Sequence, residues 1–437
     1  MKKKSIPPQL LFGLIGCLLL FLVLVKYAAY RKDATAEDRA TASTQVSAEQ
    51  RAELKLQSNQ EVTTPSSTAG EITPSNALTF PAPQPVLNVL KPETGPTSVA
   101  AEPPTKFEPI TVYYGTDRVV TGNKSPWLFY SGGKSTDLSY GTCVVTIPPH
   151  HTPGVTESPH WYQGWRKFNS EQDVNLVTID PCDSDSVFVA RLGAGLQADS
   201  QREIFLFIHG FANTFADAAR RTAQLAYDGR KAGYPMGIPV MYSFPSWGTL
   251  NPFYYVPDEQ LLDASSRHLA QFLFTLHVNF PNVPINIVAH SMGNHLFCLA
   301  LPHYEYLLAK HANPAANPSF SEVAMEAPDE DEDAFSGEAP GLFELSRRVT
   351  LYGCAHDRGI WISEEINKGD RIGDTKKRVF VLKGMDSVDA TSIADWVGHE
   401  YYALNPDIPL LFMHWSVAQR KLQEAKKGGY YILLAHH

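Results

Sequence analysis

Cysteine is scarce in this chain of 437 residues, and positive charge is nowhere concentrated after residue 106. The five cysteines are far apart and form no C-x-x-C pair: Cys17, Cys143, Cys182, Cys298 and Cys354. This spacing argues against a structural zinc site and against a disulfide framework. Cys298 and Cys354 lie in apolar runs, where a cysteine behaves as a small buried hydrophobic residue. The formal net charge is −9 and no basic tract is present in the soluble part, so nucleic acid is not an expected partner.

One long apolar run stands near the start of the chain, at residues 10–25. It is short for a membrane-spanning helix, although the tyrosines that follow can extend it into the membrane interface. It is also long for the core of a signal peptide, and no convincing small-x-small cleavage site closes it. We therefore predict an uncleaved signal anchor over residues 1–32. A lipoprotein signal that is cleaved and lipidated at Cys17, and a cleaved secretory signal, are the alternatives.

A polar stretch that becomes rich in proline follows, from Asp33 to Lys106. Alanine, threonine, serine, glutamate and glutamine dominate its first part. Such a composition cannot bury enough apolar surface to fold. We predict a disordered tether over residues 33–106 and one folded domain over residues 107–437.

Apolar segments of strand length alternate with helical patterns from residue 204 onward. Ile204–Ile208 is a solid apolar run, as in a central parallel strand that is buried on both faces. The later strands are expected at Ile238–Phe244, Ile285–Ala289, Val323–Ala327, Val349–Gly353 and Val379–Leu382. Helices are expected at Phe215–Ala226, capped by Asn213 or Thr214, and at Asp258–Phe274. This alternation predicts an α/β fold, with a mostly parallel sheet covered by helices on both faces.

The segment between residues 107 and 203 has a different pattern. Short strands are expected at Ile110–Tyr114, Cys143–Ile147, Val174–Ile179 and Val187–Ala190, with a turn at Gly115–Arg118. These strands have few helical patterns between them. We predict an N-terminal β-rich extension of the main sheet.

The most informative stretch is Ile285–Leu299, where an apolar strand pattern changes to a helical one at Ser291. Small residues two before and two after this serine, Ala289 and Gly293, allow the strand and helix backbones to approach closely. This arrangement is typical of a nucleophile elbow, which lifts a serine hydroxyl clear of the sheet. The first N–H groups of the helix, beginning with Met292, then face developing negative charge on a substrate oxygen. An ordinary strand-to-helix corner is the alternative.

A second donor for such an oxygen is expected after the strand Ile204–Ile208, in the sequence His209-Gly210-Phe211. A strand, an H-G-x turn and a helix form the arrangement that supplies the second oxyanion N–H from the residue after the glycine. Phe211 and Met292 are therefore the predicted backbone donors. A plain strand-to-helix turn is the alternative for Gly210.

Serine needs a base, and the base needs an acid that orients it. On such a sheet the chain order is serine, acid, histidine. Asp357 follows the strand Val349–Gly353 and is the predicted acid, with Asp329 after the preceding strand as the alternative acid. Asp329 opens an acidic run through Asp333 that is more simply a solvated loop.

His399 is the predicted base, because it follows the last expected strand. Three other histidines, His295, His356 and His414, are expected to be structural or exposed. His399-Glu400 does not begin an H-E-x-x-H motif, because Ala403 occupies its last position. A zinc-protease interpretation therefore fails, and no metal is expected.

The block from Tyr114 to Tyr402 resembles a bacterial α/β-hydrolase family of uncharacterised function, described as esterase- or lipase-like. The matching pieces are Gly115–Arg118, Leu138–Gly141, Phe207–Phe211, Asp217–Gln224, Ala289–Asn294, Ala327–Asp329, Asp357–Arg358 and Gly398–Tyr402. The resemblance implies the α/β-hydrolase fold and the assignment of Ser291, Asp357 and His399. The family pattern has a serine after Gly-His where this chain has Glu400, a departure that bears on the rim of the site.

The expected activity is hydrolysis of a carboxylic ester through an acyl-enzyme on Ser291, without a cofactor. The expected substrate is a small-molecule or lipid ester, with Trp161, Trp165 and Trp247 as candidates to line an acyl pocket. An amidase or peptidase with the same triad, and a catalytically idle scaffold of the cell envelope, are the alternatives. The N-terminal segment predicts a bacterial envelope protein, held at the membrane with its catalytic domain outside the cytoplasm, or otherwise a lipoprotein or secreted protein.

Overall fold

The computed structural model describes residues 107–159, 167–249, 254–311, 319–394, 399–404, 422–424 and 428–433. Contacts divide the chain into residues 1–102 and 103–437, and all described residues belong to the second unit. The predicted anchor and tether lie outside the described residues. Among the helices that are described, none combines the length and the apolar character needed to cross a membrane.

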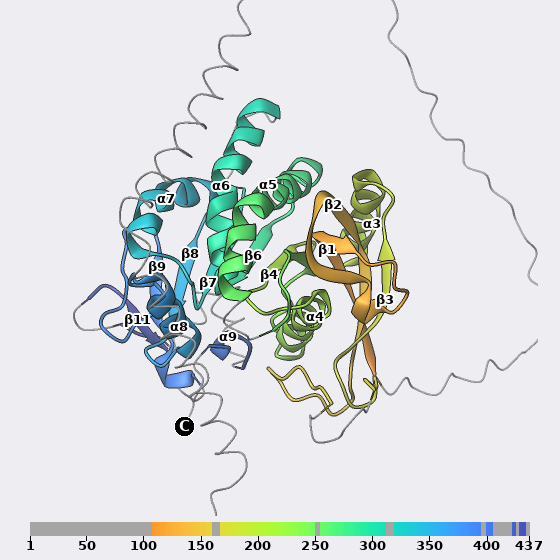
Figure 1. The fold of residues 1–437 in the computed structure, drawn as a ribbon, viewed down its shortest axis with the longest axis horizontal. Helices are drawn as coiled ribbons and strands as arrows, with labels where there is room; N and C mark the ends of the chain where they lie inside the picture. The colour runs from red at the N-terminus through yellow and green to blue at the C-terminus, as the bar shows by residue number, and fades with distance from the viewer. Residues whose placement is uncertain are drawn as a thin grey trace, which may run out of the picture. The chain divides into compact units, whose positions relative to one another are not determined.

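A sheet of 11 described strands forms the centre of this unit (Figure 1). Its strands are β1 (Glu108–Val120), β2 (Tyr130–Ile147), β3 (Asn175–Pro181), β4 (Ile204–Ile208), β5 (Ile238–Ser243), β6 (Ile285–His290), β7 (Glu322–Glu326), β8 (Val349–Gly353), β9 (Asp386–Asp389), β10 (Leu422–Glu424) and β11 (Tyr431–Leu433). Their spatial order is β10-β11-β9-β8-β7-β6-β4-β5-β1-β2-β3. Neighbouring strands are parallel throughout the run β1-β5-β4-β6-β7-β8-β9-β11. The pairs β1 with β2, β2 with β3 and β10 with β11 are antiparallel.

Helices cover both faces of the sheet, as the sequence predicts. They are α3 (Asp185–Ala198), α4 (Phe215–Lys231), α5 (Tyr255–Asn279), α6 (Met292–His311), α7 (Glu332–Leu345), α8 (Arg358–Asn367) and α9 (Tyr401–Leu404), with short 3₁₀ turns η1 (Pro126–Leu128) and η4 (Thr391–Ile393). Neighbouring residues of β5 show the division, since successive side chains in a strand point to opposite faces. Met241 packs in one core cluster with Ala219 of α4, whereas the ring of Tyr242 lies 5.8 Å from that of Phe272 in α5.

The apolar runs Ile204–Ile208 and Val349–Gly353 form β4 and β8, and every residue of both strands is buried. Burial of both faces is what a central parallel strand requires, so an unbroken apolar run identifies it. Thr214 caps α4, since its hydroxyl accepts from Asp217 N–H while the Asp217 carboxylate accepts from Thr214 N–H. This reciprocal pair is a capping box.

Two expectations for the N-terminal region are wrong. Gly115–Arg118 does not turn but lies inside β1, and the register with β2 is irregular on either side of Arg118. Val187–Ala190 is helical, within α3. Ser184 caps that helix, and Phe188, Leu192 and Leu196 are buried at a spacing of four, so the helical period prevails over the short β-branched run.

The prediction of a last strand at Val379–Leu382 is also wrong, because these residues form no strand. Phe380 is buried with its ring 6.0 Å from that of Phe335, while Val381 is 40% exposed, so the run packs through single residues. The strand beside β8 is β9, with the sequence Asp-Ser-Val-Asp. Ser387 and Val388 of this strand are buried. A search for apolar runs misses the strand, because its composition is mostly polar.

Candidate active site

Ser291 stands between β6 and α6 in a strained turn. Its φ is 52°, a left-handed conformation that non-glycine residues rarely adopt and that occurs where surrounding structure enforces it. The neighbouring glycines show how close the elements come. A Cβ at Gly293 would clash with the carbonyl of His209, and a Cβ at Gly210 would lie 2.9 Å from Cβ of Ser291. The strand, the sharp turn and the helix that the sequence predicts around Ser291 are therefore present.

His399 is hydrogen-bonded to Asp357. Nδ1 of the ring lies 2.8 Å from Oδ1 and 3.0 Å from Oδ2 of the carboxylate. Asp357 is also the N-cap of α8, where Oδ1 accepts from Ile360 N–H at 2.9 Å. A Cβ at Gly359 would lie 2.7 Å from His399 Nδ1, so the ring rests against the first turn of α8. The first turn of α8 thus fixes the Asp357 carboxylate, and the carboxylate in turn orients the imidazole of His399.

The pKa of His399 results from two opposing effects. Burial lowers it, but the charge of Asp357 and its hydrogen bond to the ring outweigh burial and raise the pKa above the ordinary value of 6.5. Glu400 and Asp329 add to the increase. The ring is therefore a stronger base than a solvent-exposed histidine.

His290 links the two segments. Its Nε2 lies 3.1 Å from the carbonyl oxygen of His399, and the two rings are 4.7 Å apart. Burial, followed by the positive charge of His399, holds the pKa of His290 well below its usual range, so the neutral ring donates from Nε2. Within the described residues Ser291 and His399 share no hydrogen bond, and such a contact is often long in a protein without substrate. Sequence patterns give His290 no role, because its partner is a backbone atom far along the chain.

Asp329, the alternative acid, is held elsewhere. It accepts from Tyr255 Oη at 2.5 Å and from the Ser363 hydroxyl, and its Oδ1 lies 3.3 Å from Arg371 Nε. Its side chain is not hydrogen-bonded to His399 among the described residues. The structure thus pairs His399 with Asp357.

The prediction of a solvated loop through Asp333 is wrong for its first two residues, since Asp329 and Glu330 are buried. Glu330 lies 2.8 Å from His295 Nδ1. Burial lowers the pKa of His295, but the hydrogen bond to Glu330 and the charge of that carboxylate raise it to about 9. This partly buried ion pair agrees with a structural role for His295.

The two predicted oxyanion donors belong to segments that lie next to Ser291. Phe211 follows Gly210 in the turn after β4, and Met292 begins α6. Neither N–H donates a hydrogen bond to another residue that the structure describes. The ring of Phe211 lies 5.4 Å from that of Tyr255.

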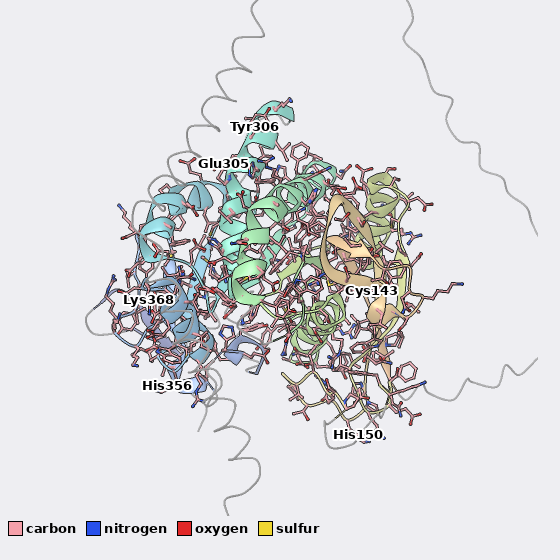
Figure 2. The ribbon with its side chains drawn as sticks, viewed as in Figure 1. Cys143, His150, Glu305, Tyr306, His356 and Lys368 are labelled. Atoms are coloured by element: carbon pink, nitrogen blue, oxygen red, sulfur yellow. The ribbon has the colours of Figure 1, made fainter. Side chains whose placement is uncertain are left out.

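Other predicted residues are placed as follows. His356 is exposed (Figure 2), and Cys298 and Cys354 are buried. Trp247 is 51% exposed, with its ring 6.0 Å from that of Tyr254. Trp161, Trp165 and His414 lie outside the described residues. In the described ranges, no three or more His, Cys, Asp and Glu side chains are grouped so that they could hold a metal ion.

Glu400, where the chain departs from the resembling family, binds Arg221 of α4. The carboxylate lies 2.9 Å from Arg221 Nη2, and its side chain is 55% exposed. Arg221 also donates to the Gly154 carbonyl at 3.0 Å. This contact joins the segment of His399 to α4 at the rim.

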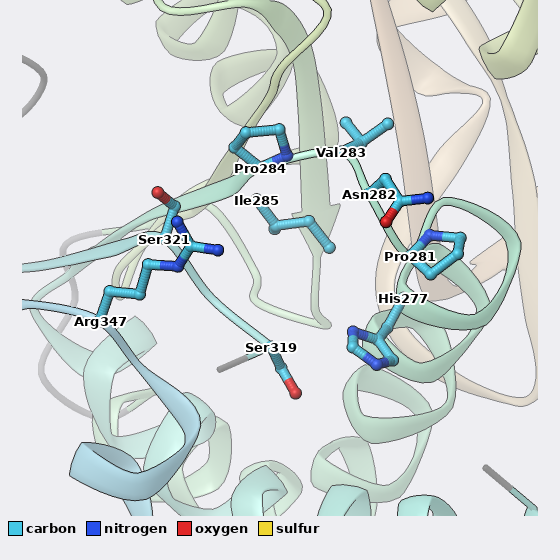
Figure 3. Close-up of a pocket in the computed structure, with 9 residues that line it drawn as sticks. All are labelled: His277, Pro281, Asn282, Val283, Pro284, Ile285, Ser319, Ser321 and Arg347. Carbon is cyan, nitrogen blue, oxygen red and sulfur yellow. The ribbon is translucent and has the colours of Figure 1, made fainter. Parts of the chain in front are cut away.

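A separate small pocket lies at the amino ends of the parallel strands (Figure 3). It has a volume of about 140 Å³, and Figure 3 places Arg347 and His277 on opposite sides of it. Pro284 and Ile285, where β6 begins, line it. Because a strand rises about 3.3 Å per residue, this pocket is on the order of 20 Å from Ser291. Ser291, Asp357 and His399 instead follow the carboxyl ends of β6, β8 and β9, where ligands bind in such sheets.

Two solved structures are similar to parts of the chain. A predicted CIB-like hydrolase from Thermoplasma acidophilum is 14% identical over 48% of this chain and 83% of its own, with a TM-score of 0.25. An inhibited esterase B from Lactobacillus rhamnosis is 12% identical over 72% of this chain and 84% of its own, also at 0.25. Scores this low leave both structures without bearing on function.

No curated protein matches the chain significantly. A family model does match: residues 185–414 fit the DUF900 family, described as alpha/beta hydrolases of unknown function. The match spans more than half of the chain and includes the elbow, the acid and the histidine. The chain therefore belongs to the DUF900 family of alpha/beta hydrolases.

Proposed function

We propose that this protein is a serine hydrolase that cleaves a carboxylic ester through an acyl-enzyme on Ser291. The observation that carries the proposal is the hydrogen bond from His399 Nδ1 to Asp357 at 2.8 Å, at the edge of the sheet where the strained turn holds Ser291. A neutral imidazole with Nδ1–H on a carboxylate leaves Nε2 as a proton acceptor. The family match supports a hydrolase, and the geometry favours a serine nucleophile.

The proposed reaction has two steps. Ser291 Oγ attacks the ester carbonyl while His399 Nε2 takes its proton, and Asp357 stabilises the imidazolium. Collapse of the tetrahedral intermediate breaks the bond to the alcohol, which leaves with the proton from His399. A water molecule then attacks the acyl group by the same route and restores Ser291. No other group has to enter for protons and electrons to balance.

The N–H groups of Phe211 and Met292 are the proposed oxyanion donors. Met292 is the first residue of α6, so its N–H stands at the positive end of a helix of 20 residues. Each donor aimed at the developing oxyanion lowers the barrier by about 3 kcal/mol. Their contribution requires that the turn after β4 stay in register with the elbow.

The test is labelling of the full chain, purified in detergent, with a fluorophosphonate, followed by mass spectrometry. We expect a single adduct on Ser291 that is lost in His399→Ala and retained in His356→Ala. His356 is the matched control, because it is next to the acid in sequence but exposed. Absence of an adduct on folded wild-type protein would favour the idle scaffold.

The choice between ester and amide substrates needs a separate measurement. We propose an ester, and paired p-nitrophenyl ester and p-nitroanilide substrates with the same acyl group test it. Ester hydrolysis that disappears in Ser291→Ala supports the proposal. Faster cleavage of the anilide would move the assignment to an amidase or peptidase.

The location remains a proposal drawn from the sequence. We propose that residues 1–32 hold the protein at a bacterial membrane, with the domain outside the cytoplasm. Protease added to intact spheroplasts should then degrade the domain. Protection from protease would overturn this topology, and mass spectrometry of the N-terminal peptide distinguishes an intact anchor from a lipid on Cys17.

A further inference from the structure

A buried arginine from β1 contacts the turn that carries Phe211. Arg118 is 1% exposed. Its Nη2 donates to the Asn213 carbonyl at 2.8 Å and lies 3.3 Å from His209 Nε2. Its Nε donates to Ser243 Oγ at 2.9 Å, and its Nη1 donates to the Ser246 carbonyl at 2.8 Å. The guanidinium therefore joins β1, the end of β5 and the turn after β4.

Arg118 keeps its charge in this environment. Burial lowers its pKa to about 10, while the negative charges of Asp117 and Asp258 oppose the decrease. A buried cation is stable only when its donors are satisfied, so each of these contacts matters. Two of these contacts, to His209 and to Asn213, are made to the segment between β4 and α4.

The charge of Arg118 fixes the hydrogen of His209. Burial, followed by the charge of Arg118, lowers the pKa of His209 to about 3, so the ring is neutral. Arginine can only donate, and Nε2 of His209 must therefore accept. The ring hydrogen is then on Nδ1, which donates to the Gly210 carbonyl at 2.8 Å.

This last bond determines where the Phe211 N–H points. The Gly210 carbonyl and the Phe211 N–H belong to one planar trans peptide and face in opposite directions. A carbonyl held by His209 Nδ1 and by Asn213 Nδ2, at 3.2 Å, holds the N–H on the other side. The turn needs such support, because Ala212 has a φ of 59°, which a residue with a Cβ rarely adopts.

We propose that Arg118 is a positioning residue for the oxyanion hole. Through His209 and Asn213 it holds the Gly210–Asn213 turn in the conformation that presents the Phe211 N–H to the substrate oxygen. The role of that N–H rests on the proposed function. The motif Gly115–Arg118 lies in β1 rather than in a turn. In this proposal its role is to place Arg118 against the Gly210–Asn213 turn.

The experiment uses the full chain with Arg118→Met and Arg118→Lys, and two readouts. Hydrogen exchange of the peptide covering residues 207–214, measured by mass spectrometry, reports on the turn without any substrate. Hydrolysis of a p-nitrophenyl ester reports on catalysis. We expect exchange to rise at least tenfold in Arg118→Met, and kcat to fall 10- to 100-fold with KM changed less than threefold. Arg118→Lys should be intermediate.

Arg348→Met is the matched control. Arg348 is partly buried and pairs with Glu322 at 2.6 Å, at the amino ends of β7 and β8. Its loss should lower stability without changing exchange at residues 207–214 or kcat. An equal effect of Arg348→Met would mean that Arg118 acts through general stability, and the proposal would be wrong.

A second pair of variants serves if loss of Arg118 prevents folding. In His209→Asn the side-chain amide nitrogen takes the place of Nδ1 and can hold the Gly210 carbonyl, whereas in His209→Gln it takes the place of Nε2. We expect His209→Asn to keep most of kcat and His209→Gln to lose 10-fold or more. Equal behaviour of the two variants, or unchanged exchange in Arg118→Met, overturns the proposal. Absence of both hydrolysis and fluorophosphonate labelling in wild-type protein overturns the proposed function, while exchange still decides whether Arg118 holds the turn.

Discussion

His399 and Asp357 are joined by a hydrogen bond that spans both carboxylate oxygens, at 2.8 Å and 3.0 Å from Nδ1. The same carboxylate caps α8 through the N–H of Ile360. The helix end thus fixes the acid, and the acid fixes the imidazole. A rigid element behind a catalytic contact is what holds it within the narrow range that chemistry requires.

Exchange of this acid for an amide separates its two roles. An asparagine side chain in place of Asp357 can still cap α8, because asparagine is as good an N-cap as aspartate. It cannot stabilise an imidazolium or hold the reactive tautomer. We expect Asp357→Asn to keep its melting temperature and to lose kcat by a factor on the order of 10³–10⁴. Thermal unfolding and ester hydrolysis measure the two effects.

Asp329→Asn is the matched control. The amide of this variant keeps one acceptor oxygen, so only one of the two hydroxyls, of Tyr255 or of Ser363, could still donate to it, and the ion pair with Arg371 would be lost. Breaking a buried pair destabilises, so we expect a lower melting temperature with kcat within tenfold of wild type. The reverse pattern, with activity lost in Asp329→Asn and kept in Asp357→Asn, would transfer the role of acid to Asp329.

If His399 is the base, its raised pKa should appear in the acid limb of the pH profile. The base must be neutral to accept the proton from Ser291, so kcat/KM should fall as pH falls through the pKa of His399. Burial lowers this pKa and Asp357 raises it, with a net increase, so the midpoint should lie above 6.5. In Asp357→Asn the residual activity should show a midpoint shifted to lower pH. A wild-type midpoint below 6.5 would contradict the assignment of His399.

The sequence predicts the central strands better than the outer ones, for a physical reason. Ser291 and His399 are candidates from chain order and, for Ser291, from a turn that only small residues permit. The strands β4, β6 and β8 are unbroken or nearly unbroken apolar runs, because both of their faces are buried. β9 has the polar sequence Asp-Ser-Val-Asp and escapes such a search, since only two of its residues are buried.

Long-range polar contacts could not be predicted from the sequence. His290 bonds a backbone carbonyl 109 residues away, and Arg118 reaches His209 across 91 residues. No local periodicity in the sequence indicates such contacts, because they depend on which strands become neighbours in the sheet. The acidic run that begins with Asp329 likewise looks solvated in the sequence, since the partners of its first two residues, Arg371 and His295, come from other elements.

The helix α6 approaches the turn after β4 so closely that position 293 has no room for a side chain. A Cβ there would clash with the carbonyl of His209, a backbone atom that cannot move away as a side chain can. We expect Gly293→Ala to lower the free energy of unfolding by about 1–3 kcal/mol and to abolish labelling of Ser291. Gly337→Ala in α7 is the control, because a Cβ there meets nothing within 4 Å. That variant should be neutral or stabilised by up to about 1 kcal/mol. Equal stability of the two variants would show that the elbow has room to spare.

His151 should make stability depend on pH. Its Nδ1 lies 2.9 Å from Glu157 Oε2 and its Nε2 lies 2.9 Å from Asp228 Oδ1, with the side chain 2% exposed. Burial lowers its pKa, but these two carboxylates raise it from 6.5 to about 9. The folded state therefore binds the proton more tightly than the unfolded state. The resulting stabilisation is fully present below pH 6.5 and is lost as pH rises to 9.

A shift of this size corresponds to at most about 3 kcal/mol of unfolding free energy. We expect His151→Gln to be less stable than wild type at pH 6 by a large part of this amount, with the difference shrinking steadily toward pH 9. Chemical denaturation at several pH values measures it. His150→Gln is the matched control, because His150 is exposed at the neighbouring position (Figure 2) and should change stability by less than about 0.5 kcal/mol. A difference for His151→Gln that is the same at pH 6 and pH 9 would mean that the ring stabilises the fold by packing, since a packing contribution does not titrate.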